Sequence, residues 1–360
     1  MPKLTLLKHG SHIHDAYEPL PGETDGAAGS STDAARPEKK GTGILQRFSK
    51  HEPATERPQA LGWIKHRYTE AIEYTNMVEG LRGAGFLIGL FGGSGSVFGA
   101  AYPWYIGLGS GDWFGLLMLL VFTPIMFLFG SWVLAFGLRF DLFKPADLPI
   151  IFDRKHRKVY RILREEQIGP LGFFKPWPLM ACEYEWDLVD AEHQAEIVTS
   201  GKLVTRNHFL MFAVRKSAED PTIIDSFQIA NANSLGEQLV PAMWEHIRRF
   251  MEERGPHLPS PGEPLAAIAE SPSWWQCMGA TGPFGPNYFT EWRENTGFQI
   301  IMHVGLPFFL PMFLIWGTGN WLGHKTSYRI DWPDEVLAAI GPAQDDARTY
   351  RAQPSGTDEE

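Results

Sequence analysis

Two long uncharged runs separated by a short turn constrain this chain more than any other feature of its sequence. Gly83–Gly111 and Trp113–Leu138 contain 29 and 26 residues without a charged side chain, and Asp112 stands between them. About 20 apolar residues span the hydrocarbon core of a bilayer as a helix, so each run is long enough to cross it. Gly109–Asp112 consists of turn-forming residues. We therefore predict a transmembrane helical hairpin over residues 83–138.

The distribution of positive charge predicts the orientation of this hairpin. The turn between the two runs carries only Asp112, whereas several lysines and arginines follow the second run. Positively charged flanks remain in the cytoplasm during insertion. The N-terminus and residues 139–294 are therefore expected on the cytoplasmic side. The residues that carry this charge are Arg139, Lys144, Arg154, Lys155, Arg157 and Lys158.

Composition and motifs argue against several classes of function. The net charge of −10 disfavours nucleic acid as a partner. Cys182 and Cys277 lie far apart, which disfavours a structural zinc site or a disulfide framework. The sequence contains no HExxH, Walker, Rossmann or nucleophile-elbow motif. We therefore predict a protein without enzymatic activity, with no catalytic residue, no metal and no cofactor.

The segments before the hairpin differ in character. Residues 1–60 are rich in Gly, Pro, Ser, Asp and Glu, and such a composition is typical of a disordered tail. In residues 61–82, apolar side chains such as Ile64, Tyr68 and Ile72 recur at helical spacing between charged residues. This pattern predicts an amphipathic juxtamembrane helix that runs into the first span.

Residues 149–255 have the pattern of a cytosolic β domain. Strand-like runs flank a basic turn at 153–158 and recur up to Ile229, after which Leu235, Leu239, Met243 and Ile247 mark one face of a helix. Several strands followed by one C-terminal helix are the order of a pleckstrin-homology-like barrel, and an α+β sandwich is the alternative. The expected fold class is thus an α+β membrane protein, with a transmembrane hairpin followed by this domain and then by a third transmembrane helix.

The C-terminal third divides into three segments. Residues 256–294 are rich in Pro, Gly and Trp and read as an irregular linker at the membrane surface. Asn295–Gly323 is a third uncharged run, whose length predicts a third transmembrane helix kinked at Pro307 and Pro311; a re-entrant or interfacial helix is the alternative. If it spans the membrane, the acidic tail 324–360 lies outside the cytoplasm.

Three sets of residues are candidate sites. Small residues at four-residue spacing allow close helix packing, either within the hairpin or between two copies of the chain. A basic cluster close to the second span can attract anionic lipid, although it can equally be a solvated turn. His303, inside the third run, is either a possible intramembrane polar site or a neutral imidazole bonded to a neighbouring helix. The small residues are Gly85, Gly89, Gly93, Gly95 and Gly99, and the basic residues are Arg154, Lys155, Arg157, Lys158 and Arg161.

Two segments together carry a resemblance to a known family. An apolar hairpin precedes Pro149–Tyr160, which reads PIIFDRKHRKVY, and much later Trp244–Glu253 reads WEHIRRFMEE and is followed by Gly255-Pro256. Over roughly residues 80–260 the chain resembles a family of uncharacterised Gram-negative inner-membrane proteins whose members are often encoded beside type VI secretion effectors. The layout also resembles that of hairpin-anchored bacterial pleckstrin-homology-like proteins.

The resemblance implies a function based on binding. It suggests an inner-membrane immunity or accessory protein that binds and occludes a secreted toxin or effector. The alternative, which comes from the residues, is an inner-membrane scaffold that binds membrane lipids through the basic cluster and self-assembles into a homo-oligomer through the glycine face.

Overall fold

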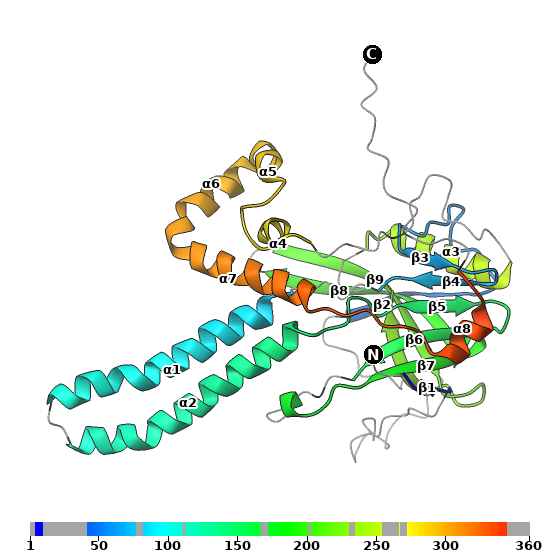
Figure 1. Cartoon of the computed structure of the whole chain (residues 1–360). Coiled ribbons are helices and arrows are strands. Elements are labelled where there is room, and N and C mark those ends of the chain that lie inside the picture. Colours follow the sequence, from blue (N-terminus) through cyan, green and yellow to red (C-terminus); the bar gives the residue numbers. More distant parts are fainter. Residues whose placement is uncertain are drawn as a thin grey trace, which may run out of the picture.

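An α+β domain with a long helical hairpin projecting from it makes up most of the described chain (Figure 1). The computed structural model describes residues 4–9, 42–76, 82–110, 113–165, 167, 172–200, 203–229, 235–253, 266 and 272–343. Within these residues, the hairpin helices α1 (Ala84–Ser110) and α2 (Trp113–Asp141) are long and apolar enough to cross a membrane. The hairpin therefore extends well beyond the surface of the domain (Figure 1).

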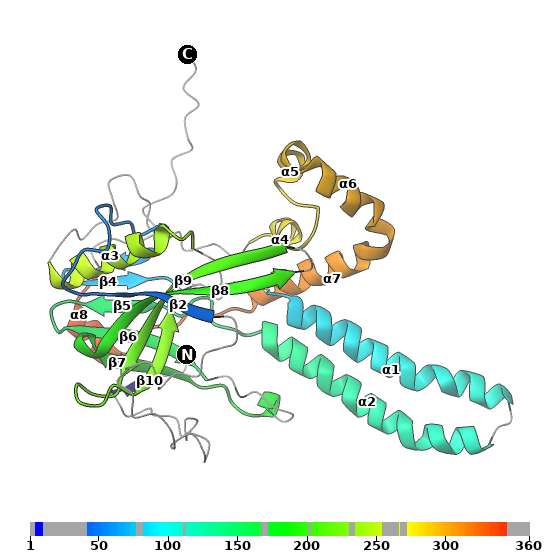
Figure 2. The ribbon, with the colours of Figure 1, turned by 180° about the vertical axis from the view of Figure 1, so that it is seen from behind.

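Two β-sheets form the domain. The first has the strand order β1-β7-β6-β5-β4-β3 and is antiparallel except for the β1–β7 pair, and the second has the order β10-β9-β8-β2 and is antiparallel throughout (Figure 2). The strands of the first sheet are β1 (Leu6–Leu7), β3 (Ile64–Arg67), β4 (Ala71–Tyr74), β5 (Ile150–Asp153), β6 (Lys158–Arg164) and β7 (Leu179–Glu185). Those of the second are β2 (Thr42–Phe48), β8 (Val189–Ser200), β9 (Leu203–Arg215) and β10 (Ile223–Gln228).

The hairpin is inserted into the first sheet. Strand β4 precedes α1 and strand β5 follows α2, yet Tyr74 pairs with Ile150 and Ala71 pairs with Asp153. Backbone hydrogen bonds between these neighbouring strands thus close the domain beneath the hairpin. As a result, both ends of the hairpin are fixed to one sheet.

Both faces of the first sheet are buried, as alternation along β5 shows. Ile150 and Phe152 point into the main core, which also contains Trp186 and residues of the second sheet such as Phe212. Ile151 points to the opposite face and packs there with the C-terminal segment. Successive side chains of a strand alternate between faces, so a fully apolar run such as Ile150–Phe152 suits a sheet covered on both sides.

Helix α3 (Leu239–Glu252) covers the main core, and its apolar stripe decides which side faces inward. Val240, Met243, Trp244, Ile247 and Phe250 are fully buried and belong to the same cluster as the strands of both sheets. Fully burying side chains of this size stabilises the fold by about 1.5–3 kcal/mol each. The helix that the sequence indicates after Leu235 is therefore present and is part of the core.

Four further helices form an arm beside the base of the hairpin. They are α4 (Trp274–Thr281), α5 (Tyr288–Glu294), α6 (Thr296–Val304) and α7 (Leu306–Lys325), and α6 and α7 meet at a bend of 98° (Figure 1). Gly305 lies at the bend and Pro307 lies in the first turn of α7. Proline has no N–H to donate and fits the first turn of a helix, so this position is compatible with a new helix start. The third uncharged run is thus a broken pair of helices.

The structure corrects two expectations for the N-terminal region. Residues 61–82 were expected as one amphipathic helix, but 64–74 form the antiparallel strands β3 and β4. Leu61 and Gly62 have positive φ angles of 56° and 70°, which are incompatible with a right-handed helix at these positions. The regular apolar spacing arises because Ile64 and Ile72, on two different strands, lie in the same core. Pairing with β5 overrides the periodicity.

Parts of the expected disordered tail also have defined structure. Strand β1 pairs with β7, and β2 pairs with β8, within the segment 1–60 that composition assigns to a tail. The apolar content of a segment does not reveal whether its backbone pairs with distant strands. Residues 1–3 and 10–41 of this segment lie outside the described residues.

Two corrections also apply to the C-terminal region. The expected irregular linker 256–294 contains α4 and α5, and α4 begins with a capping box between Ser273 and Gln276 that is visible in the sequence. The expected tail 324–360 includes α8 (Asp334–Ile340), whose Val336 and Ile340 pack on the outer face of the first sheet. The composition of the tail did not indicate this short apolar face, because charged residues surround it in the sequence.

Candidate partner-binding site

Strand β2 forms an exposed edge of the second sheet. It is the last strand in the order β10-β9-β8-β2 among the residues that the structure describes. Its register with β8 shifts between Ile44 and Gln46, and Ile44 and Leu45 are 38% and 41% exposed. An edge strand with neighbouring exposed apolar side chains is a typical place for another chain to dock.

Phe48 fixes the end of β2 to the domain. Its ring stacks on Trp244 of α3, with ring centroids 5.7 Å apart, and on His193 of β8, with centroids 6.4 Å apart. Beyond Phe48, the chain follows α3, because Ala54 N–H donates to Glu245 Oε2 at 2.9 Å and Gln59 N–H donates to Ala242 O at 3.0 Å. Aromatic packing and these hydrogen bonds hold β2 in place, so its exposed side is presented rigidly.

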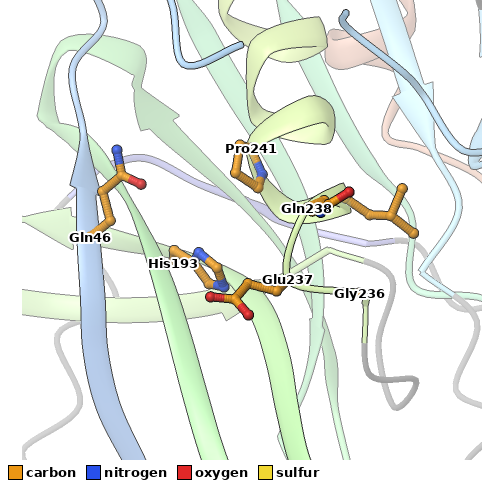
Figure 3. Close-up of a pocket in the computed structure, with 7 residues that line it drawn as sticks. Gln46, His193, Gly236, Glu237, Gln238 and Pro241 are labelled. Carbon is orange, nitrogen blue, oxygen red and sulfur yellow. The ribbon is translucent and has the colours of Figure 1, made fainter.

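A cavity of about 700 Å³ adjoins β2 (Figure 3). It lies between β2, β8 and the segment that leads into α3, and Figure 3 shows the Glu237 carboxylate close to the His193 ring. Its wall combines hydrogen-bonding groups with one exposed leucine, as a site for a peptide or polar side chain would. The lining residues are Gln46, His193, Gly236, Glu237, Gln238, Leu239 and Pro241.

Two histidines set the electrostatics of the cavity wall. His193 Nε2 and His208 Nδ1 are 2.9 Å apart, and both side chains are buried. Burial lowers the pKa of His193, the neighbouring His208 lowers it further, and Glu237 opposes the shift. The His193 ring is therefore neutral at pH 7 and can take part in hydrogen bonds without charge. No group of three or more potential metal ligands occurs among the described residues.

We use the name β2 surface for Ile44, Leu45, Gln46, Glu237 and Leu239. This surface combines exposed apolar side chains with an acid and an amide. None of these residues is among the sites expected from sequence. Gln46 and Glu237 lie far apart in the chain, so no local spacing joins them, and the only available signal was the short apolar run at Ile44-Leu45 and Phe48.

The basic cluster expected to contact lipid lies on the β5–β6 turn and on β6. In both views this turn is at the end of the domain away from the hairpin (Figures 1 and 2). Four of the five basic residues make ion pairs with carboxylates, and Lys155 is exposed. The position of the turn disfavours a lipid role for Arg154, Lys155, Arg157 and Lys158, and the ion pair with Asp225 disfavours one for Arg161, which lies opposite Ile150. The pairs are Arg154–Glu70 at 2.6 Å, Arg157–Asp187 at 2.5 Å and Arg157–Glu252 at 3.1 Å, Lys158–Glu183 at 2.6 Å, and Arg161–Asp225 at 2.6 Å.

The expected glycine face divides into two parts. A Cβ added to Gly89 would lie 3.1 Å from Gly137 Cα, and one added to Gly93 would lie 2.7 Å from Gly130 O, so these glycines, like Gly85, allow α1 and α2 to pack closely. A Cβ added to Gly95 or Gly99 would meet nothing within 4 Å. The first part therefore serves packing within the hairpin, and Gly95 and Gly99 face away from α2.

His303 lies in an aromatic cluster that joins α5 to α6. Its Nδ1 is 2.7 Å from the carbonyl oxygen of Gln299, and its Nε2 is 3.1 Å from the Tyr288 hydroxyl. Since a carbonyl only accepts, Nδ1 donates to it, and Nε2 is free to accept from the hydroxyl in the neutral ring. Trp292 packs against the ring, with centroids 5.0 Å apart. Both ring nitrogens of His303 therefore have a hydrogen-bond partner within the arm.

A polar joint at the base of the hairpin was not anticipated from the sequence. Asp141 Oδ2, at the end of α2, accepts the N–H of Phe86 in α1 at 2.5 Å. Trp316 Nε1 and Asn320 Nδ2 of α7 donate to Arg82 O at 3.1 and 3.3 Å. The three helices are therefore held together where they meet the domain.

Comparison with known proteins identifies one family. The profile of a family of unknown function, DUF6708, matches residues 125–340. The match begins inside α2 and ends at the last residue of α8, so it includes the β domain from β5 onward and the whole helical arm. No curated protein and no solved structure matches the chain.

Proposed function

This chain belongs to DUF6708, a family of unknown function, and we propose from its geometry that it is a membrane-anchored protein that binds and occludes a protein partner. In the form implied by the sequence resemblance, the partner is a secreted toxin or effector of type VI secretion. The chain then acts as its immunity or accessory protein at the bacterial inner membrane. Such a role depends on a binding surface and requires no catalytic residue.

The observation that carries this proposal is the β2 surface. Exposed Ile44 and Leu45 lie on an edge strand, next to a cavity that offers the Gln46 amide and the Glu237 carboxylate. Apolar anchors beside hydrogen-bonding groups are the usual composition of a protein contact. The rigid attachment of Phe48 lowers the entropic cost of binding, because the surface is ordered before the partner arrives.

The strand order supports a pleckstrin-homology-like organisation of the domain. Four strands, β4 to β7, form one antiparallel meander and three strands, β8 to β10, form a second, and α3 follows them. This is the order expected of such a barrel, with the hairpin inserted after β4. The positive charge that follows the hairpin supports a cytoplasmic location for the domain.

Copurification with matched variants tests the proposal. The full-length tagged protein, crosslinked in its native membrane and then solubilised, should retain one stoichiometric secreted effector. Ile44→Lys and Leu45→Lys should abolish its retention, because a charge at an apolar contact is costly to desolvate. Ala218→Lys, at an exposed position on the β9–β10 loop, should leave retention unchanged.

Two outcomes would contradict the proposal. The first is recovery of the chain without a stoichiometric protein partner, and the second is equal retention by all three lysine variants. If an effector is found, survival of cells that express it separates the two roles, because only an immunity protein is required for survival. The alternative lipid-binding scaffold depends on the basic cluster, whose placement and ion pairs give it no support.

A further inference from the structure

The helical arm exposes an apolar elbow. No charged residue occurs between Asn295 and Gly323, and the residues around the α6–α7 bend are the most exposed, with Phe308 at 84%, Val304 at 75% and Ile301 at 69%. The surface of a soluble protein seldom exposes so many large apolar side chains together. We call Phe298–Leu314 the elbow; its large apolar side chains that are exposed are Phe298, Ile300, Ile301, Val304, Phe308, Phe309 and Leu314.

Both ends of the arm are attached to the same domain. Before the arm, Ala266 N–H donates to Ile64 O of β3 at 2.7 Å. After it, Tyr328 pairs with the segment that follows α2, since Tyr328 N–H donates to Lys144 O at 3.2 Å and Ala146 N–H donates to Tyr328 O at 2.9 Å. The chain then packs Trp332 and α8 on the outer face of the first sheet. The arm therefore leaves the domain and returns to it.

The C-terminal half of α7 is fixed at the base of the hairpin. A Cβ added to Gly319 would lie 2.8 Å from Phe86, and Trp316 Nε1 donates to Arg82 O at 3.1 Å. This close contact makes the apolar surface of the arm continuous with that of α1 and α2. The elbow thus projects from the point at which the hairpin leaves the domain (Figure 1).

Helix α6 is too short to bring the chain back from the far side of a bilayer. Helix α7 has 20 residues and would extend about 30 Å, but α6 has 9 residues and extends only about 14 Å. The hydrocarbon core is about 30 Å thick. If the elbow stood at the far side, the chain could not return through α6, and Glu291, Arg293 and Glu294 of α5 would be left in the hydrocarbon.

We propose that the elbow is a re-entrant membrane element that binds the hydrocarbon of the bilayer from the side that carries the β domain. It dips into the leaflet next to the hairpin, turns at Gly305 and leaves on the side from which it entered. The inference goes beyond protein binding but rests on one part of that proposal, the crossing of the membrane by α1 and α2. The proposal also places α8 on the same side of the membrane as the β domain. It therefore disagrees with the expectation from sequence that Asn295–Gly323 crosses the membrane.

Substituted cysteines in the full-length protein test this topology. Trp113→Cys lies at the start of α2, Phe308→Cys lies in the elbow, and Leu337→Cys lies on the exposed side of α8; all three native side chains are exposed. The unsubstituted protein, whose Cys182 and Cys277 are buried, is the control for background reaction. A membrane-impermeant maleimide is applied to intact spheroplasts and to inside-out vesicles.

The expected pattern is labelling of Trp113→Cys from one side only, labelling of Leu337→Cys from the other side only, and no labelling of Phe308→Cys from either. A nitroxide on Phe308→Cys should be accessible to oxygen and protected from a polar nickel chelate, which identifies hydrocarbon as its surroundings. Phe298→Cys, at the start of the elbow in α6, serves as the second position if Phe308→Cys does not accumulate.

Each contrary result has a distinct meaning. Labelling of Leu337→Cys from the Trp113→Cys side, with the hairpin crossing intact, would show that α6–α7 crosses the membrane and would overturn the proposal. Labelling of Phe308→Cys by the maleimide, or protection of its nitroxide from both oxygen and nickel, would place the elbow in water or under protein, and either would also overturn it. Access to Trp113→Cys only from the Leu337→Cys side would instead refute the hairpin crossing on which the proposal rests.

Discussion

The Glu245 carboxylate accepts the backbone N–H of Ala54 at 2.9 Å, although 191 residues separate the two. Glu245 is fully buried, and the same carboxylate pairs with Arg248 at 2.7 Å and Arg249 at 2.6 Å. Arg249 also donates to Thr55 O at 3.2 Å. This network ties the segment after β2 to α3, and the residues of Trp244–Glu253 that carry the family resemblance thus have a structural role.

Glu245→Gln should strongly destabilise the protein. The amide can still accept from Ala54, but Arg249 loses the carboxylate it pairs with and buried Arg248 keeps only the exposed Glu253 as its counter-charge. Removing the charge of one partner in a buried ion pair costs about 3–5 kcal/mol. The free energy of unfolding in urea, followed by tryptophan fluorescence of the detergent-solubilised protein, measures the loss.

Glu253→Gln is the matched control, because its carboxylate pairs with the same Arg248 but its side chain is 52% exposed. An exposed pair contributes about 1 kcal/mol or less. Equal losses for the two variants would show that burial of Glu245 does not make the difference.

Gly93→Ala should disturb the hairpin, whereas Gly95→Ala should not. A Cβ at Gly93 would lie 2.7 Å from Gly130 O and 2.8 Å from Leu134 Cβ, so α1 and α2 must separate. Overpacking of this kind costs about 1–3 kcal/mol. Thermal unfolding in detergent should show a lower midpoint for Gly93→Ala alone. A similar drop for Gly95→Ala would indicate that the face of α1 turned away from α2 is also covered, as in a homo-oligomer.

The free energy of unfolding should decrease as the pH is lowered below about 6.5, because of His193. Its folded pKa is lowered from the ordinary value of 6.5, mainly by burial, so the unfolded chain binds more protons between the two values. The stabilisation is therefore complete above pH 6.5 and is lost as the pH falls toward the folded pKa, at no more than about 1.4 kcal/mol per pH unit.

His193→Gln should reduce this slope, because glutamine does not titrate. The unfolding free energy measured between pH 7 and pH 5 provides the comparison. An unchanged slope in His193→Gln would assign the pH dependence to other groups.

Arg157→Gln should weaken the fold in any lipid. Arg157 pairs with Asp187 at 2.5 Å and Glu252 at 3.1 Å, and these carboxylates raise its pKa. Because Arg157 is 41% exposed, solvent screens the pairs and the expected loss is about 1 kcal/mol or less. Lys155→Gln, on the same turn, should change nothing.

Thermal midpoints in nanodiscs measure both variants in zwitterionic and in anionic lipid. The shift caused by Arg157→Gln should be the same in the two lipids. A larger shift in anionic lipid, for Arg157→Gln or Lys155→Gln, would restore the lipid-binding interpretation of the basic cluster.

Local patterns in the sequence were sufficient for the elements that depend on local physics. The hairpin α1–α2 follows from two uncharged runs, because a long helix satisfies its own backbone and needs only apolar side chains. The strands β5 and β6 follow from apolar runs around the Asp153–Lys158 turn, and α3 follows from the spacing of Leu239, Met243 and Ile247. Each of these patterns is complete within a single stretch of chain.

Only the tertiary structure showed which distant segments of the chain pair with one another. Strand β2 exists because β8 and Glu245 hold a segment whose composition resembles a tail. Strand β4 exists because β5 pairs with it across the inserted hairpin, and β3 in turn pairs with β4. The broken helix α6–α7 was ambiguous for the same reason, since its length alone also fits a span. Composition and periodicity describe neighbours along the chain, and they carry no information about which distant backbone or carboxylate completes a hydrogen bond.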